Sequence, residues 1–341
     1  MDLTSFRAQL LTSIKAAKAQ QAEANLHLLY IPELSDPLEL VEDSRRISAL
    51  LRPASHSPLS GIESERLPRL ITFDCKRVAA YLFESDVALD DPLFEASITQ
   101  AHAEWCLNQR VDAELENDDR VFADVTIGGW LLSNDSAETI AKRIQDYSTL
   151  HADGAQRHWV RWYNPVYLSA LWPTLHPEQR YALLGNTTWI TFDATGQLQR
   201  YAASALSEQK TGVSTYGLRR IDLVQAETLK NVPLVHDLLQ AWQTLCAEQD
   251  RSLPPSAEQD LHLHVLAAQR YRLDAESVAI YVMTAVQLKP GATEDAEWVQ
   301  LMRHSANNGL LLRDMLEELP DRFWEQWALD PADNQRVNDE I

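Results

Sequence analysis

The sequence predicts an α+β protein with an N-terminal α/β lobe that holds a small mixed sheet and a C-terminal all-helical lobe. Its 341 residues are enough for two domains, each with its own apolar core. Apolar runs typical of strands recur up to about residue 201, and beyond that point apolar residues recur at helical spacing only. We therefore expect an α/β domain over 1–205 and a helical domain over 206–341, with a polar linker at 206–218.

The first lobe is expected to open on an amphipathic helix. Leu3, Phe6, Leu10 and Ile14 recur at helical spacing and place this helix at roughly 3–23. Short apolar runs bounded by proline or turn residues then predict strands, and longer amphipathic stretches predict helices. The expected strands are 25–31, 69–73, 121–132, 188–192 and 198–201, the last two forming a hairpin, and the expected helices are a short piece near 44–51, then 75–84, 92–109 and 137–150.

Two adjacent glycines, Gly128 and Gly129, stand inside the expected strand 121–132. Only 10 of the 341 residues are glycine, well below the roughly 7% average, so this pair is unusual for the chain. Glycines inside a strand predict a β-bulge or a close approach of another backbone.

The stretch 157–168 predicts a strand that stops and becomes a helix. Its aromatic and β-branched residues, Trp159 to Tyr163, suit a half-buried sheet. Asn164 follows as an N-cap, because its side-chain oxygen can accept a hydrogen bond from a free backbone N–H of the first turn. Pro165 then stands at the first helical position, where a missing N–H costs nothing. Asn164 and Pro165 are thus expected to form a structural turn.

The second lobe carries almost no strand signal. An amphipathic helix around 235–246 is followed by a proline break at 254–255. Phe323, Trp324 and Trp327 belong to a short last helix. The other helices are expected near 257–272, 275–287, 294–306 and 309–318, and 330–341 is expected to be a frayed acidic tail.

Charge and composition limit the classes of partner. The formal net charge is −20, and so acidic a surface repels phosphate backbones, which argues against nucleic acid. Solubility is the simplest reason for this charge, and attraction of a basic protein is the alternative. The three cysteines form no CxxC pair and suit a reducing compartment. With no signal peptide and no run of about 18 apolar residues, we expect a cytoplasmic protein without membrane insertion.

No catalytic or metal-binding motif is complete in this sequence. His102 and Glu104 form the His-x-Glu of zinc deaminases, but the second half of that motif is absent and Cys106 stands alone. His262 and His264 lie two residues apart in an expected helix, so their rings point in different directions, one toward the core and one toward solvent. We therefore expect no enzyme activity, no metal and no cofactor.

Aromatic residues are dense between 159 and 192, and most of them must pack in the core. One or two exposed ones could anchor a partner, because aromatic and arginine side chains carry most of the energy at interfaces. An internal ion pair that holds the strand–helix turn is the more ordinary role for Arg161. The candidate anchors are Arg161, Trp162 and Tyr163 in the first lobe and Trp324 and Trp327 in the second.

Several short motifs of the first lobe occur together in an order that resembles a bacterial family. In chain order they are Leu28-Leu29-Tyr30, Leu67-Pro68-Arg69-Leu70, Gly129-Trp130-Leu131-Leu132-Ser133, Asp153-Gly154, Arg161-Trp162-Tyr163-Asn164-Pro165, Gln179 and Leu184-Gly185. They resemble the type VI secretion adaptors, often called Tap or TEC chaperones, a family first catalogued as a domain of unknown function. The family usually has Asp where this chain has Asn164, and both residues cap helices well. The resemblance covers most of the first lobe and none of the second.

This resemblance implies a non-enzymatic adaptor that binds the N-terminal region of a secreted toxin effector and helps to load it onto the secretion spike protein. An uncharacterised hydrolase or transferase, with a site assembled from distant residues, is the alternative, and a structural subunit of a larger assembly is a third. An adaptor should expose apolar grooves without a deep polar pocket. An enzyme should instead have a concave pocket with convergent titratable groups.

Overall fold

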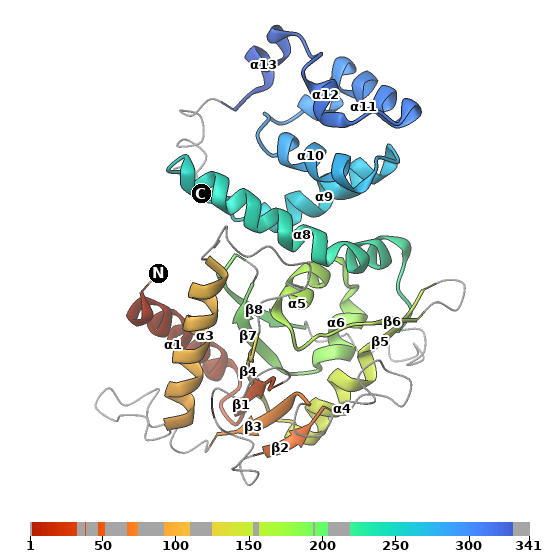
Figure 1. Ribbon diagram of the computed structural model, residues 1–341. Coiled ribbons are helices and arrows are strands. Elements are labelled where there is room, and N and C mark those ends of the chain that lie inside the picture. The colour runs from red at the N-terminus through yellow and green to blue at the C-terminus, as the bar shows by residue number, and fades with distance from the viewer. Residues whose placement is uncertain are drawn as a thin grey trace. The chain divides into compact units, whose positions relative to one another are not determined.

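The computed structural model describes residues 2–32, 38, 47–51, 67–73, 92–109, 125–152, 157–193, 195–203 and 219–329. The chain forms two compact units, Met1–Val232 and Pro233–Ile341. The first combines a sheet with helices and the second is helical, which confirms the predicted α+β class (Figure 1). The division falls inside helix α8 (Leu223–Glu248), whereas the expected boundary at 205/206 and the expected linker lie outside the described residues.

A six-stranded sheet forms the centre of the first unit, in the order β2-β3-β1-β4-β7-β8. Every pairing in this sheet is antiparallel, where a mixed sheet was expected from the sequence. β7 and β8 form the expected hairpin. The strands are β1 (Asn25–Tyr30), β2 (Ile47–Leu50), β3 (Arg69–Thr72), β4 (Ile127–Ser133), β7 (Thr188–Phe192) and β8 (Leu198–Ala202).

Helices cover both faces of the sheet, so the central strands β1 and β4 are buried almost throughout rather than on alternate residues (Figure 1). On one face Leu26, Leu28 and Tyr30 of β1 share an apolar core with α1 and α3. On the other face Leu29 shares a second core with α4, α5 and α6. These helices are α1 (Leu3–Gln20), α3 (Pro92–Gln109), α4 (Ala137–Tyr147), α5 (Pro165–Leu171) and α6 (Pro177–Leu184).

The two glycines of β4 lie where the sheet is most crowded. A β-bulge shifts the register of β1 against β4 at Gly128. A Cβ on Gly128 would lie 2.6 Å from the carbonyl oxygen of Tyr163, and one on Gly129 would lie 2.6 Å from that of Ile190. The bulge and the close backbone approach predicted from the glycine pair are therefore both confirmed.

Three stretches of the first unit differ from expectation. The strand expected to run through Tyr163 ends at Trp159, and 160–163 connect it to α5. The sequence favours a short helical piece near 44–51, but 47–50 form strand β2, because so short an apolar run suits either structure and its pairing with β3 decides. The expected helix 137–150 ends at Tyr147, since Leu150 pairs with His158 in a separate two-stranded sheet. That sheet consists of β5 (Thr149–His151) and β6 (Arg157–Trp159).

Several expected features lie outside the described residues. They are the helix 75–84, the first part of the strand 121–132, the turn Asp153-Gly154 and the acidic tail 330–341.

The helical unit has an aromatic centre. Trp298 is fully buried, lies against Tyr281 with ring centroids 5.5 Å apart, and stacks on Phe323 with centroids 6.0 Å apart. These three rings join α10, α11 and α13. The helices that follow α8 are α9 (Ala257–Arg270), α10 (Ala275–Ala285), α11 (Ala296–Asn308), α12 (Leu312–Leu316) and α13 (Asp321–Trp327).

Across the part of the chain that the structure describes, no helix combines the length and the apolar character needed to cross a bilayer.

Candidate functional site

The strand–helix junction after β6 is held by a side-chain cap. Asn164 is the N-cap of α5, and its Oδ1 accepts a hydrogen bond from the Val166 N–H at 3.0 Å. Pro165 follows in the first turn of the helix, where its missing N–H leaves no bond unmade. The Leu168 N–H donates to the backbone carbonyl of Asn164 at 3.2 Å. The turn therefore fixes where residues 161–163 lie.

Two of the candidate anchors beside this turn lie in the interior. Trp162 is 1% exposed, and its Nε1 donates to the backbone carbonyl of Tyr147 at 2.7 Å. Tyr163 is 4% exposed, and both rings belong to the core beneath α4 and α5. A partner that docks on the surface does not reach these rings, so packing is the role that the geometry gives them.

Arg161 differs from its two neighbours because part of its side chain is exposed. It lies near the phenol of Tyr167, where burial raises the pKa and the Arg161 guanidinium offsets part of that rise. Of the three candidate anchors in the first lobe, Arg161 is thus the one whose side chain is partly exposed to solvent.

The two candidate tryptophans of α13 are half-buried. Trp327 lies beside Gly291, and its backbone carbonyl accepts a hydrogen bond from the Lys289 N–H at 2.7 Å. Trp324 packs edge-to-face on Phe323, with ring centroids 5.5 Å apart, and lines a pocket described below. Both indoles are therefore placed where a partner can reach part of the ring.

The side chains of the incomplete deaminase motif point to different partners. Glu104 is buried and accepts from the backbone N–H groups of Thr126 and Ile127, so it ties α3 to the start of β4. His102 instead lies 3.7 Å from the sulfur of Cys106 through its Nε2. The carboxylate is used as a structural acceptor, and the motif does not converge on one point.

The histidine pair of α9 also separates. His262 is buried, and burial lowers its pKa to about 4, while His264 is partly exposed. In the described part of the chain no group of three or more His, Cys, Asp or Glu side chains lies close enough to share a metal ion.

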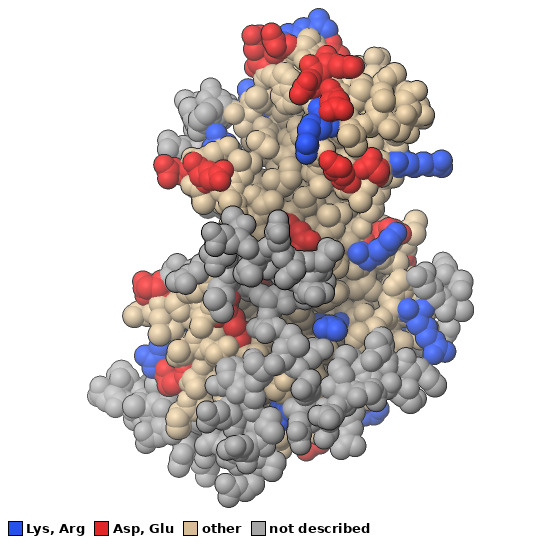
Figure 2. Space-filling view, in the orientation of Figure 1, with Lys and Arg blue, Asp and Glu red and all other residues tan. Residues whose placement is uncertain are grey.

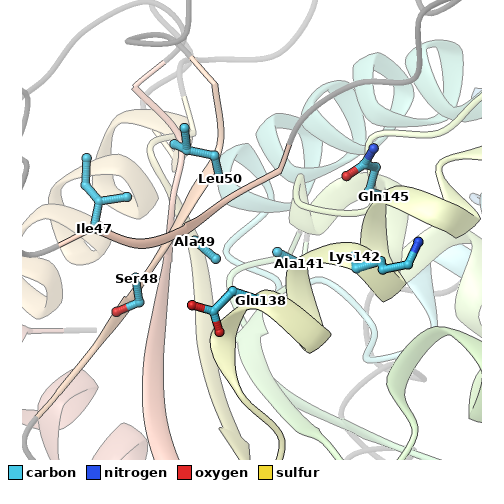
Figure 3. Close-up of a pocket in the computed structure, with 8 residues that line it drawn as sticks. All are labelled: Ile47, Ser48, Ala49, Leu50, Glu138, Ala141, Lys142 and Gln145. Atoms are coloured by element: carbon cyan, nitrogen blue, oxygen red, sulfur yellow. The ribbon is translucent and has the colours of Figure 1, made fainter.

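A groove of about 570 Å³ runs between edge strand β2 and helix α4, and we call it the edge groove (Figure 3). Ala49 and Ala141 face each other across it. Ser48 and Glu138 lie at one end, and Lys142 and Gln145 lie at the other. The full lining is Ile47, Ser48, Ala49, Leu50, Glu138, Ala141, Lys142 and Gln145.

The polar groups near this groove hold strands together. The Thr72 N–H donates to Ser48 Oγ at 3.0 Å, and Nδ1 of buried His27 lies 2.9 Å from the Thr72 hydroxyl. Burial lowers the pKa of His27 to about 4, which keeps the ring neutral. Glu138 is fully exposed, and its position in the first turn of α4, with hydrogen bonds from its own backbone N–H and from Ser136, lowers its pKa. Ser48 and His27 both engage Thr72 rather than each other.

A second pocket of about 370 Å³ lies in the helical unit, and we call it the helix-end pocket. It forms where α8, α10 and α13 end. Its lining combines one indole, one guanidinium, two amides and several small or aliphatic side chains: Gln249, Arg251, Thr284, Gln287, Leu288, Trp324, Ala328 and Leu329.

Comparison of the chain with protein-family models, curated proteins and solved structures found no match.

Most residues of both cavities carry no functional signal in the sequence. β2 lies in a stretch whose short apolar run gives no distinct strand signal, so its edge position follows only from its pairing with β3. Arg251 belongs to no motif, and its pocket gathers side chains from residues 249 to 329. Of the predicted anchors, Trp324 lines one of these two cavities.

Proposed function

We propose that this protein is a non-enzymatic adaptor that binds the N-terminal region of a secreted toxin effector and helps to load it onto the secretion spike protein. The proposal takes its partners from the family resemblance of the first lobe. The observation that supports it most is the edge groove, because a groove beside the last described strand of a sheet is a surface on which an extended segment can dock.

The edge groove has the features that strand addition requires. Among the described strands, β2 pairs with β3 only and ends the sheet. A peptide that adds to a sheet edge gains main-chain hydrogen bonds, and pockets beside the edge select its side chains. Ala49 and Ala141 leave room for an apolar side chain between strand and helix. An effector segment bound as an extra strand is therefore the mode of binding that we propose.

The charge of the chain suits a basic effector segment. On the face shown in Figure 2, acidic side chains are spread over the surface with Lys and Arg between them, rather than gathered in one patch. With a net charge of −20, this surface attracts a basic partner at long range. Encounter should accordingly become slower as salt is added, while contacts in the groove change little.

The enzymatic alternative finds less support in the same groove. A nucleophilic serine needs a base within hydrogen-bond reach. His27 is bonded to Thr72 instead of Ser48, and Glu138 at the groove mouth is fully exposed. The polar groups near the groove thus act as structural contacts between strands.

The proposal is tested by co-expressing the protein with a toxin effector chosen from the neighbouring genes and measuring capture by pull-down. Lys142→Trp fills one end of the edge groove and should reduce capture by about tenfold or more, a loss of about 1.4 kcal/mol. Lys230→Trp is a matched control, because Lys142 and Lys230 are both exposed helical lysines paired with one carboxylate nearby, 3.1 Å from Asp146 and 3.6 Å from Glu227.

Two outcomes would contradict the proposal. If the toxin remains soluble and is secreted without this protein, and no complex forms, the adaptor function fails. If capture occurs but Lys142→Trp and Lys230→Trp bind equally well, the adaptor function stands and the edge groove is not its binding surface.

A further inference from the structure

The helix-end pocket is built by backbone bonds that leave its side chains available. The Lys289 N–H donates to the carbonyl of Trp327, and the Leu329 N–H donates to that of Gln287 at 3.1 Å. Leu288 and Ala328 form a bridge between these two bonds. The segment after α13 is thereby tied to the segment after α10, and their side chains form one wall of the pocket.

Arg251 is placed in the pocket by the way α8 ends. Asp250 takes a left-handed conformation with φ of 53°, a position that more often carries glycine or asparagine. The Arg251 N–H then folds back to the carbonyl of Cys246 at 2.8 Å. This turn fixes the backbone of Arg251 directly after the helix, and the residue lines the pocket where the three helices end.

Among the described residues, no carboxylate forms an ion pair with the guanidinium of Arg251. By contrast, Arg313 and Arg322 of the same unit pair with Glu276 and Glu297. Among the described lining residues, Arg251 alone carries a charge. In a chain with 50 acidic and 30 basic side chains, a partly buried arginine in a cavity whose described lining carries no carboxylate is unusual. The positive charge of Arg251 also interacts favourably with the dipole at the C-terminal end of α8, and this interaction leaves the guanidinium N–H donors available.

The rest of the lining suits an apolar group next to an anion. Trp324 is half-buried, and Leu288 and Leu329 add aliphatic surface. The volume of about 370 Å³ lies at the lower end of the range for ligand pockets. Such a space takes a few side chains of a peptide rather than a large cofactor.

We propose that the helix-end pocket binds a partner-protein segment in which a glutamate or aspartate lies next to an aliphatic or aromatic side chain. The carboxylate pairs with Arg251 in the two-pronged geometry that guanidinium favours, and the apolar side chain packs on Trp324. This site is separate from the edge groove, and the proposal does not depend on the adaptor function.

The test uses two probe peptides, acetyl-Ala-Leu-Glu-Leu-Ala-amide and the same peptide with Gln in place of Glu. Calorimetry with the full chain at about 0.15 M salt measures both affinities, since surface charges are then screened beyond about 8 Å. We expect the Glu peptide to bind at least about tenfold more tightly than the Gln peptide.

Variants separate the two contacts. Arg251→Gln should bring the two peptides to equal affinity. Arg251→Lys should keep part of the preference for the Glu peptide, because lysine retains the positive charge but lacks the two parallel N–H donors of a guanidinium. Trp324→Ala should weaken both peptides by a similar factor. Arg303→Gln, an exposed arginine of α11 outside the pocket, is the matched control and should change nothing.

Three results would overturn the proposal. One is equal binding of the Glu and Gln peptides to the unaltered protein. Another is a preference that survives in Arg251→Gln, provided that its thermal melt matches that of Arg303→Gln. The third is no binding of either peptide.

Discussion

Replacing Gly129 by alanine should destabilise the first unit strongly, because two separate obstacles act on the same Cβ. The φ of this residue is +127°, a region that side-chain-bearing residues rarely adopt. The added Cβ would also lie 2.6 Å from the Ile190 carbonyl oxygen and 2.7 Å from Nε1 of Trp189. Backbone oxygen and a fully buried indole cannot move aside cheaply.

The expected loss follows from these two obstacles. A residue held in a sparsely populated backbone region costs on the order of 1–3 kcal/mol. Adding a carbon to a well-packed core costs about 1–3 kcal/mol more. Their sum of about 2–6 kcal/mol is a large part of the roughly 5–15 kcal/mol that stabilises a typical domain. The Trp189 indole also donates to the Gly128 carbonyl at 2.9 Å, so a shift of β4 against β7 would lengthen that bond.

Hydrogen exchange measured by mass spectrometry on peptides of β4 and β7 reports this loss locally. Gly309→Ala is the matched control, because Gly309 has a φ of +61° but nothing lies within 4 Å of its added Cβ. That control should cost only about 1–2 kcal/mol, measured on peptides of α11. If Gly129→Ala loses no more protection than Gly309→Ala, crowding at Gly129 does not contribute to the loss of stability.

Three further changes probe local contacts. Asn164→Ala should lower the free energy of unfolding by roughly 0.5–2 kcal/mol and Asn164→Asp should keep it, since aspartate retains the capping oxygen; equal melts of all three proteins would exclude the cap. Burial gives folded His262 a pKa of about 4, whereas a histidine in the unfolded chain has a pKa of about 6.5. Between these values the unfolded chain binds more protons than the folded one, so the free energy of unfolding should be about 2 kcal/mol lower at pH 5 than at pH 7. His262→Leu should flatten that slope, and an unchanged slope in urea titrations at both pH values would contradict it. Glu104→Gln should lower the free energy of unfolding by about 1–3 kcal/mol, because the amide has one acceptor oxygen whereas the carboxylate accepts from Thr126 and Ile127 with two. Urea unfolding measures this loss, and an unchanged free energy would mean that the second acceptor oxygen is dispensable.

The parts of the fold that local sequence determines were predictable. The helix start at Asn164-Pro165 depends on side-chain chemistry within a few residues, and the glycines of β4 mark their own crowding. The order of the strands was not predictable, because β1 lies between β3 and β4 through contacts that span many residues. β2 was missed for the same reason, since its partner rather than its own sequence makes it a strand.

The candidate binding residues also divide into those that residue type alone identifies and those that depend on contacts between distant parts of the chain. The aromatic content around 159–192 predicted Trp162 and Tyr163 as candidate anchors, but both rings lie in the core. Their burial depends on which strands and helices enclose them, and local sequence does not determine that. Trp324 was identified by its type and lines the helix-end pocket. Arg251 carries no signal in the sequence, because which described carboxylates lie within reach of its guanidinium depends on how the helices fold.

The two cavities have different consequences for how tightly partners are held. A tenfold preference for a carboxylate at Arg251 corresponds to about 1.4 kcal/mol, far less than the roughly 8 kcal/mol of a micromolar complex. That figure covers only the exchange of a carboxylate for an amide, and the apolar side chain packed on Trp324 adds to the affinity of the helix-end pocket. Strand addition along β2 can supply more, because each added residue brings main-chain hydrogen bonds. The edge groove would hold a basic segment and the helix-end pocket would select an acidic one, so one chain could distinguish two partners. Because an adaptor has to release its cargo, neither partner should be bound irreversibly.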